Sequence, residues 1–237
     1  MYAFVSKDIS NGLLEKLRLK YRVIKLSPDK RLYTSIESHP DIRVLPIDNQ
    51  LFIDQETYND LNAQNVFSKK DLQGITAIDI ELSSIYPNTV FLNGKYKDHL
   101  FIHHKKYTHP IVGDYILAKD ISFIHTNQGY TGCSLLLLDH SSGITSDAGI
   151  YKTLNRQGMQ ILKIQEGHIH LQDKPYGFIG GASGVEGKQV FFNGNIKKHP
   201  DYKLIQEFIE HRGYTIIDNP QIPLTDIGSI LFWKGSV

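Results

Sequence analysis

The chain has 237 residues, 26 lysines and arginines against 25 aspartates and glutamates, and a formal net charge of +1. A nearly neutral chain has no extended basic field, so we expect neither nucleic acid nor a membrane as a partner. The single cysteine, Cys133, excludes a disulfide within the chain. The first residues lack the pattern of a secretory signal, and no apolar run approaches the roughly 20 residues of a membrane span, so we expect a cytoplasmic protein.

Three helices are predicted from capping residues at their starts and from apolar residues at helical spacing. They cover residues 9–20, 146–158 and 201–213. Short apolar strands precede them at residues 2–5, 135–138 and 190–192, and further strands follow at residues 21–26, 159–164 and 214–217. The chain therefore repeats a strand–helix–strand unit.

Two weaker units lie between the first and second of these helices. Residues 51–53 and 100–102 are predicted to be their first strands. A short helix is predicted at residues 56–62, whereas residues 105–114 contain Pro110 and Gly113 and are predicted to be irregular.

A period of about 47 residues runs through the whole chain, which is typical of repeat proteins and propellers. The marks of the five first strands are Phe4, Phe52, Phe101, Leu136 and Phe191. Turn-like segments recur with the same step at residues 39–41, 86–88, 132–134, 182–184 and 227–229. An unpaired strand at each end, 2–5 and 230–233, predicts that the units close into a ring. We therefore expect one domain, residues 1–237; the alternative is a non-repeating α+β domain.

Three segments resemble motifs of the pentein superfamily of guanidino-group-modifying proteins, which includes arginine deiminases, dimethylarginine hydrolases and amidinotransferases. They are residues 86–94 (YPNTVFLNG), 129–134 (GYTGCS) and 226–230 (DIGSI). The resemblance implies an α/β fold, a five-bladed αβ propeller with pseudo-fivefold repeats, and a substrate held in its central channel.

The residues that carry pentein chemistry are replaced at the matching positions. Gly94 stands where an aspartate would hold the guanidinium, and Ser229 where the nucleophilic cysteine would stand. Cys133 occupies the place of the general-acid histidine, and Leu135 that of the aspartate after it. The chain thus resembles an uncharacterised branch of the superfamily that lacks the standard catalytic Cys and His.

Cys133 and His39 are the candidate catalytic residues. Cys133 could be a nucleophile served by His39 from another blade, or a small buried residue, which is how free cysteine often behaves. His39 and Asp41 are two residues apart, which would place both on one face of a strand as a general-base pair. The alternative is a simple turn before a strand.

Two other patterns are weaker. Residues 180–184 (GGASG) do not lead into the lysine and helix of a phosphate loop, so their glycines are expected to let the backbone pass close to the ring axis or a ligand. His168 and His170 would share a strand face, but only Asp173 lies near them as a third metal ligand. We expect no metal and no cofactor.

The sequence leaves three functions open. The first is a small-molecule-binding protein that holds a small polar or amine-bearing metabolite. Its channel would be lined by Asp41, Asn88, Asn93, Cys133, Ser183, Asp226 and Ser229. The second is an unorthodox hydrolase or transferase that uses Cys133 on guanidino or amidino C–N bonds. The third is a structural or interaction module whose channel is filled with packed side chains.

Overall fold

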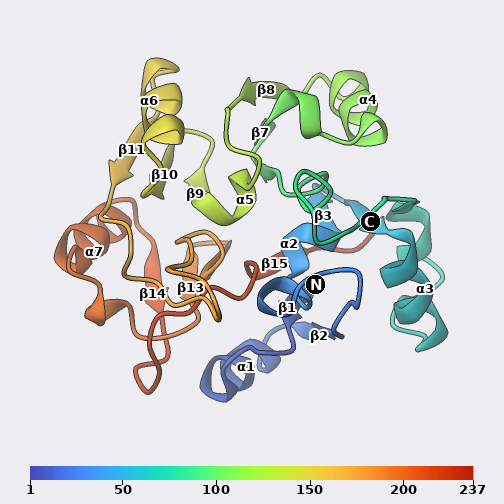
Figure 1. The fold of residues 1–237 in the computed structure, drawn as a ribbon, viewed down its shortest axis with the longest axis horizontal. Coiled ribbons are helices and arrows are strands. Elements are labelled where there is room, and N and C mark those ends of the chain that lie inside the picture. The colour runs from blue at the N-terminus through green and yellow to red at the C-terminus, as the bar shows by residue number, and fades with distance from the viewer. Residues whose placement is uncertain (237) are drawn as a thin grey trace.

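The computed structural model describes residues 1–236 and contains five small sheets arranged as blades around a central axis (Figure 1). Each blade has an inner, a middle and an outer strand. The inner strands are β3 (Val44–Ile47), β6 (Lys95–Lys97), β9 (Leu135–Asp139), β12 (Ser183–Glu186) and β15 (Leu231–Trp233). The middle strands are β1 (Tyr2–Ser6), β4 (Gln50–Asp54), β7 (Leu100–His103), β10 (Ser142–Thr145) and β13 (Gln189–Phe192). The outer strands are β2 (Arg22–Leu26), β5 (Ile75–Ile78), β8 (Ser122–His125), β11 (Gln160–Lys163) and β14 (Thr215–Ile217).

Inner and middle strands pair antiparallel, whereas middle and outer strands pair parallel. A parallel pair needs a crossover, and one peripheral helix supplies it in each blade. These helices are α1 (Asn11–Arg18), α3 (Gln55–Ala63), α4 (Pro110–Ala118), α6 (Ala148–Arg156) and α7 (Tyr202–Glu210). Two short helices, α2 (Pro40–Arg43) and α5 (Thr131–Ser134), precede inner strands β3 and β9. Single 3-10 turns lie at Thr34–Ile36, Asp71–Gly74, Lys105–Tyr107 and Ile196–Lys198.

The ring closes through the two ends of the chain, as the sequence predicts. Strand β15 pairs antiparallel with β1, with Phe4 opposite Leu231, and so completes the first blade. The five inner strands contact one another in a complete cycle, β15 to β3, β6, β9, β12 and back to β15. The five-unit ring is therefore confirmed. No helix within residues 1–236 is long and apolar enough to cross a membrane.

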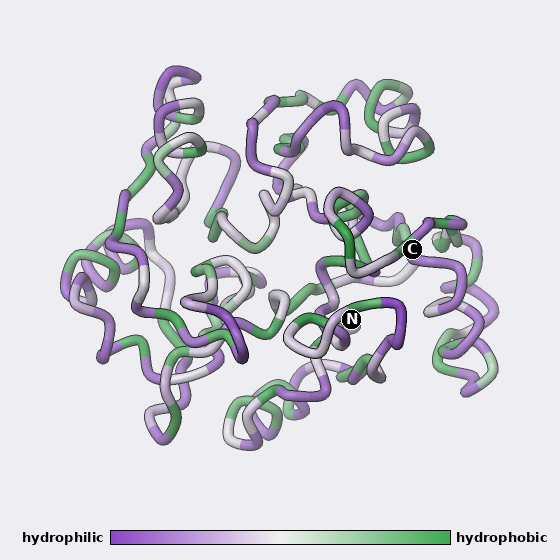
Figure 2. The backbone as a smooth tube through the Cα atoms, viewed as in Figure 1, coloured by the Kyte–Doolittle hydropathy of each residue, from purple (hydrophilic) through white to green (hydrophobic). Residues whose placement is uncertain are grey.

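The hydrophobic core is divided among the five interfaces between neighbouring blades, and hydrophobic residues accordingly recur in every blade of the chain trace (Figure 2). Strand β4 shows the principle, because alternate side chains of a strand point to opposite faces. Leu51 and Ile53 pack with Phe4 of one neighbouring blade, whereas Phe52 packs with Phe101 of the other. The blade is thus packed against a neighbour on both faces, which explains why consecutive residues of β4, from Leu51 to Ile53, are apolar.

Two sequence expectations about the repeat units are wrong. Helix α4 begins at Pro110, inside the segment expected to be irregular. Proline is tolerated in the first helical turn, where its missing N–H has no helical partner, and Val112 and Ile116 supply the buried face. Leu136 lies on inner strand β9, whereas the matching middle strand β10 carries Ile144. Strand β9 is the more apolar strand of the β9–β10 hairpin, which is why the sequence pattern favoured Leu136 as the position of the first strand.

Two pairs of residues that were expected to share a strand face do not do so. Asp41 lies in helix α2 and His39 precedes it, so the two do not share a strand face. Pro40 after His39 starts the helix, because its fixed φ suits the first helical position. His168 is outside any strand, and His170 forms only an isolated bridge with Thr225.

Candidate functional site

Five chain segments, one ahead of each inner strand, meet at one end of the ring axis. They are joined by hydrogen bonds that run from segment to segment around the axis. The amide of Asp41 donates to Gly228 O, that of Ser229 to Gly181 O, that of Gly181 to Cys133 O and that of Gly132 to Asn93 O. The amide nitrogen Nδ2 of Asn93 donates to Asp41 O at 3.1 Å and completes the circle. Three of the predicted turn-like segments, 39–41, 132–134 and 227–229, therefore come together in this circle. Its other two members are Gly181, next to segment 182–184, and Asn93, five residues after segment 86–88.

A cavity of about 330 Å³ opens at this end of the axis. It is lined by Tyr33, Ile36, His39, Ile42, Tyr130, Cys133, Leu171, Lys174, Pro175, Tyr176, Phe178 and Asp226. Three residues singled out from the sequence, His39, Cys133 and Asp226, are among them. The lining combines apolar and aromatic walls with a few ionisable groups, as is common for small-molecule sites.

Cys133 is held by two neighbours beside the cavity. Its thiol Sγ donates to Asp41 Oδ2 at 3.0 Å and accepts from Asn93 Nδ2 at 3.2 Å. Its backbone amide donates to Asn93 Oδ1 at 3.2 Å, so the Asn93 side chain fixes the turn of α5. Burial, together with the charges of Asp41 and Asp226, raises the pKa of the Cys133 thiol well above its ordinary value. Cys133 is thus a protonated hydrogen-bond donor to Asp41, and His39 is not its hydrogen-bond partner.

Asp41 is the centre of this polar cluster. Its Oδ2 also accepts a hydrogen bond from Ser229 Oγ at 2.8 Å, while its Oδ1 is buried without a partner among residues 1–236. Ser229 itself has a φ of 68°, in the left-handed region that non-glycine residues seldom adopt. Strained backbone of this kind occurs where a side chain is held in a fixed place, here the hydroxyl against Asp41.

Asp226 forms a second buried carboxylate on the cavity. Its Oδ1 accepts from the amide of Gly228 at 3.0 Å, and its Oδ2 accepts from the amide of Phe178 at 2.9 Å. Burial is the largest cause that raises the pKa of this carboxyl, and the nearby His39 and the two amides act in the opposite direction. The carboxyl is therefore positioned by the backbone but lacks a cationic partner within 4 Å in the described chain.

Two glycines make room for these groups. A Cβ on Gly181 would lie 2.0 Å from Asp226 Oδ1. Gly228 has a φ of 74°, and a Cβ there would lie 2.3 Å from the Cβ of His39. The expectation that glycines of the 180–184 segment allow close approach at the axis is confirmed for Gly181.

Lys95 brings one positive charge close to the two carboxylates. Its Nζ donates to Gly132 O at 3.2 Å from the side of the axis opposite the cavity. Burial lowers the pKa of Lys95, and the charges of Asp41 and Asp226 oppose this shift. No carboxylate of residues 1–236 lies within 4 Å of its Nζ, so Lys95 offsets the charge of the cluster without forming an ion pair.

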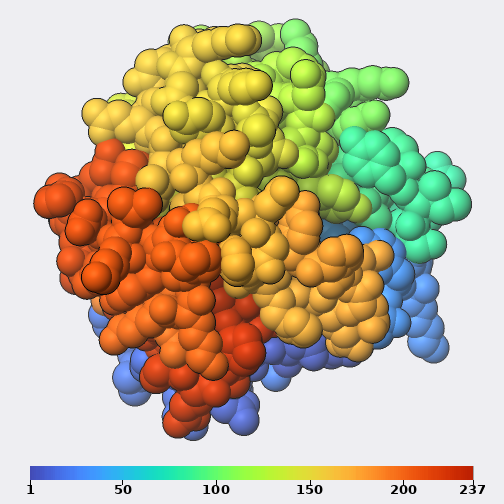
Figure 3. Space-filling view, turned by 60° about the vertical axis from the view of Figure 1, so that its left-hand side comes forward, coloured from blue at the N-terminus to red at the C-terminus, as the bar shows by residue number. Residues whose placement is uncertain are grey.

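Aromatic side chains form the walls of the cavity. Tyr130 Oη is 2.6 Å from Thr89 Oγ1, which fixes the ring, and burial raises the pKa of Tyr130 above its ordinary value. Residues 165–178 cross the surface as an irregular strap, amber in Figure 3, and bring Phe178 and Lys174 to the cavity. Lys174 Nζ lies 4.3 Å from the centre of the Tyr33 ring, a cation–π contact at the rim.

Of the six expected ligand-binding residues, only Asp226 lines this cavity. Asp41, Asn93 and Ser229 belong to the hydrogen-bond network around Cys133, and Asn88 and Ser183 take no part in it. Ser183 is fully buried, and its hydroxyl donates to Ile179 O at 2.7 Å within its own segment. Asn88 is half-buried on the segment before Asn93, and its amide donates to Ile85 O at 2.9 Å. The amide side chain that reaches the site is that of Asn93.

The sequence reasoning missed the aromatic walls and Lys95. Tyr130 stands next to the GCS turn and could have been inferred from that neighbour. Tyr33 and Phe178 lie in irregular segments outside the repeat, so periodicity carried no signal for them. No group of three or more His, Cys, Asp or Glu within residues 1–236 is arranged to hold a metal ion.

Comparison with solved structures gives the fold. Dimethylarginine dimethylaminohydrolase from Pseudomonas aeruginosa superposes with a TM-score of 0.56 at 12% identity over 92% of this chain and 91% of that one. Agmatine deiminase from C. jejuni gives 0.56 at 9% identity over 100% and 94%. An amidinotransferase of the saxitoxin biosynthetic pathway from Microseira wollei gives 0.51 at 12% identity over 94% and 81%.

These three proteins belong to the pentein superfamily, and identities this low establish the shared fold alone. A search of curated protein sequences found no match. The model of a family of unknown function, DUF6873, matches residues 4–231, nearly the full length of the chain. The chain is therefore a pentein-fold protein that belongs to the family DUF6873.

Proposed function

We propose that this protein binds a small organic cation, bearing an amine or amidine group, in the cavity at the Asp226 end of the ring. One observation carries the proposal. Two buried carboxylates, Asp41 and Asp226, lie at this end of the axis, and neither has an ion-pair partner within 4 Å in residues 1–236. Removing such groups from water is costly, and a bound cation would offset that cost.

The walls of the cavity suit the same ligand. Tyr33, Tyr130 and Phe178 present aromatic surface, which attracts cations through the negative face of the ring. The chemistry of the solved relatives points in the same direction, since their names describe proteins that act on guanidino compounds. A planar amidine or guanidine can donate paired hydrogen bonds to one carboxylate, whereas an ammonium acts as a point charge.

We further propose that binding proceeds without deiminase-type turnover. Attack on a guanidino carbon requires a thiolate and a group that moves protons. The raised pKa keeps the Cys133 thiol protonated near neutral pH, and its hydrogen bond is directed to Asp41. The alternative, a Cys133-dependent hydrolase or transferase, is supported by one observation: Cys133 and His39 line the same cavity. An open cavity of about 330 Å³ argues against a purely structural module.

Calorimetry tests the binding proposal. Putrescine, agmatine and arginine are the cationic probes, and citrulline, which carries an uncharged ureido group, is the matched neutral probe. We expect saturable binding of at least one cation, weakened by about 2–4 kcal/mol in Asp226→Asn because a desolvated charge pair is lost. Asp114→Asn, an exposed carboxylate on α4, is the control and should leave binding unchanged. Equal affinity in wild type and Asp226→Asn, or selection of citrulline over the cations, would contradict the proposal.

A turnover assay separates the two enzymatic alternatives. We expect neither citrulline nor ammonia to form from arginine, agmatine or methylated arginines. Product formation that disappears in Cys133→Ala would establish the Cys133-dependent enzyme instead. Product formation that survives in Cys133→Ala would point to another nucleophile, for which Ser229 is the nearest hydroxyl to Asp41.

A further inference from the structure

A second cavity, of about 210 Å³, lies on the ring axis between the inner strands, away from the Asp226 cavity. All five inner strands contribute to its wall. Their lining residues include Leu45 on β3, Tyr96 on β6, Leu136 on β9, Val185 on β12 and Phe232 on β15. Apolar side chains from all five strands thus stand beside the charged groups of the wall.

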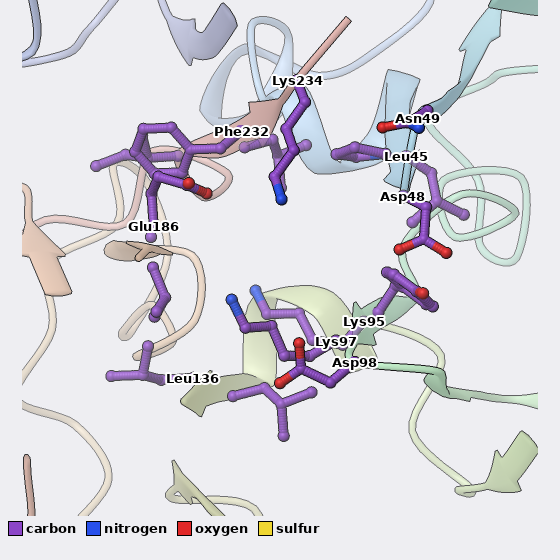
Figure 4. A pocket seen from close by; sticks show the side chains of 18 residues that line it. Leu45, Asp48, Asn49, Lys95, Lys97, Asp98, Leu136, Glu186, Phe232 and Lys234 are labelled. Carbon is purple, nitrogen blue, oxygen red and sulfur yellow. The ribbon is translucent and has the colours of Figure 1, made fainter. Parts of the chain in front are cut away.

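Three lysine side chains converge on this second cavity. Figure 4 shows the amino groups of Lys95, Lys97 and Lys234 pointing into its open middle from two opposite sides. None of the three lies within 4 Å of a carboxylate in the described part of the chain. Lys95 Nζ has the Gly132 carbonyl as a hydrogen-bond acceptor, and no side-chain acceptor was found for Lys97 or Lys234 within residues 1–236. The three ammonium groups therefore retain free donor capacity toward the space between them.

Three carboxylates also line the second cavity. Asp48 and Glu186 stand at opposite sides of the rim in Figure 4, whereas the carboxylate of Asp98 lies beside the side chains of Lys95 and Lys97. A negatively charged ligand that extended to this rim would be repelled. The arrangement therefore selects for a compact anion that fits between the lysines.

We propose that the second cavity binds a small oxyanion of at least two negative charges, of the phosphate or pyrophosphate type. Lysine ammonium groups bind such ions as point charges, and three of them around one space match a multiply charged centre better than a single carboxylate. The site is separate from the cation cavity and does not depend on the proposed function there.

The burial of Lys95 agrees with this assignment. Its pKa is lowered by desolvation, so its charged form lacks full compensation in the unliganded ring. An anion in the second cavity would supply that compensation from one side, while Asp41 and Asp226 act from the other. The ammonium of Lys95 would thereby bind the anion while it keeps its hydrogen bond to Gly132 O.

Titration calorimetry with inorganic phosphate and pyrophosphate, at constant ionic strength, tests the site. We expect saturable binding to the wild type, tighter for pyrophosphate, with the Kd raised at least about ten-fold in Lys97→Gln/Lys234→Gln because two charge-assisted contacts are lost. Both lysines are at least partly exposed, so the double variant should fold, which thermal unfolding can verify.

A matched double variant controls for net charge. Lys163→Gln/Lys203→Gln removes two exposed lysines on the peripheral elements β11 and α7 and should bind the oxyanions as the wild type does. Asp226→Asn should also retain oxyanion binding, which distinguishes this site from the cation cavity. The proposal is overturned if the wild type shows no saturable binding at millimolar phosphate or pyrophosphate, or if the two double variants lose affinity equally.

Discussion

The two cavities on the ring axis share a backbone framework and differ in the sign of their charged groups. The cavity at the start of the inner strands has aromatic walls and the carboxylate of Asp226 in its lining, and the carboxylate of Asp41 lies next to it, bonded to the Cys133 thiol. The cavity along the strands is surrounded by the amino groups of Lys95, Lys97 and Lys234. The fivefold repeat therefore builds two concave sites, and a few residues outside the hydrophobic pattern decide what each can bind.

Strand β6 and the turn before it show how closely the two sites are coupled in sequence. Asn93 fixes Cys133 on the carboxylate side, and Lys95, two residues later, lines the second cavity while its Nζ reaches Gly132 O. One extended segment thus supplies Asn93, which holds Cys133 in place, to one site and the amino group of Lys95 to the other. Exchanging residues here would affect both cavities, whereas changes to Asp226 or Lys234 should affect only one.

Opening the ring should remove both sites and have the largest effect. Trp233 is buried on β15, and its Nε1 donates to Asn49 O at 3.0 Å. Trp233→Ala should lower the free energy of unfolding by about 3–5 kcal/mol, since a large side chain leaves a cavity at the closing interface. Denaturant unfolding measures the loss, and Leu204→Ala, an exposed change on α7, should have little effect. A stable Trp233→Ala ring would show that closure by β15 contributes little.

Gly181→Ala should impair the cation cavity and leave the second cavity intact, with an intermediate loss of stability. The new Cβ would lie 2.0 Å from Asp226 Oδ1, so the carboxyl must move and lose its bond to Gly228. We expect a loss of about 1–3 kcal/mol in the free energy of unfolding and weaker cation binding, with oxyanion binding retained. Gly113→Ala, on helix α4 with open space around it, is the control and should be neutral or slightly stabilising. Unchanged cation affinity in Gly181→Ala would show that the position of Asp226 is unimportant.

The pH dependence of stability should reveal the burial of Asp226, with the smallest effect. Its pKa is raised in the folded chain, so the folded protein holds this proton more tightly than the unfolded protein does. Its contribution to stability is present below the ordinary aspartate pKa and is lost as pH rises through the raised value, with a slope of at most about 1.4 kcal/mol per pH unit.

Urea unfolding at a series of pH values measures this contribution as the difference between wild type and Asp226→Asn. The remaining titrating groups are common to both proteins, so they cancel in the difference. A difference that stays constant from the aspartate range to neutral pH would mean that Asp226 ionises as an exposed carboxyl does.

The repeat predicted the ring because each unit uses the same backbone plan and buries both faces of its sheet. The step of about 47 residues located turns at the axis, and with them His39, Asp41, Cys133 and Ser229, whereas Asp226 was predicted from the resemblance of residues 226–230 to a pentein segment. Helix α4 was missed because proline was taken as a helix breaker, although in the first helical turn it is compatible with a helix.

Other parts of the site could not be predicted from the period. Tyr33 and Phe178 reach the cavity from irregular segments, whose positions depend on tertiary contacts such as that between Lys174 and Tyr33. Asn88 and Asn93 were both predicted to line the channel, but only Asn93 contacts Cys133, because the three-dimensional turn decides which of the two side chains reaches the axis.

The ionisation of Asp226 in the free and bound protein is the most direct test of the central claim. The carboxyl carbon of Asp226 can be followed by ¹³C NMR through a pH titration, with and without saturating putrescine, and assigned from the spectrum of Asp226→Asn. We predict a pKa above the ordinary aspartate range in the free protein, because the carboxyl is buried, and a lower pKa when the cation is bound. An ordinary pKa in the free protein, or a pKa that putrescine leaves unchanged, would contradict the assignment of this cavity to a cation.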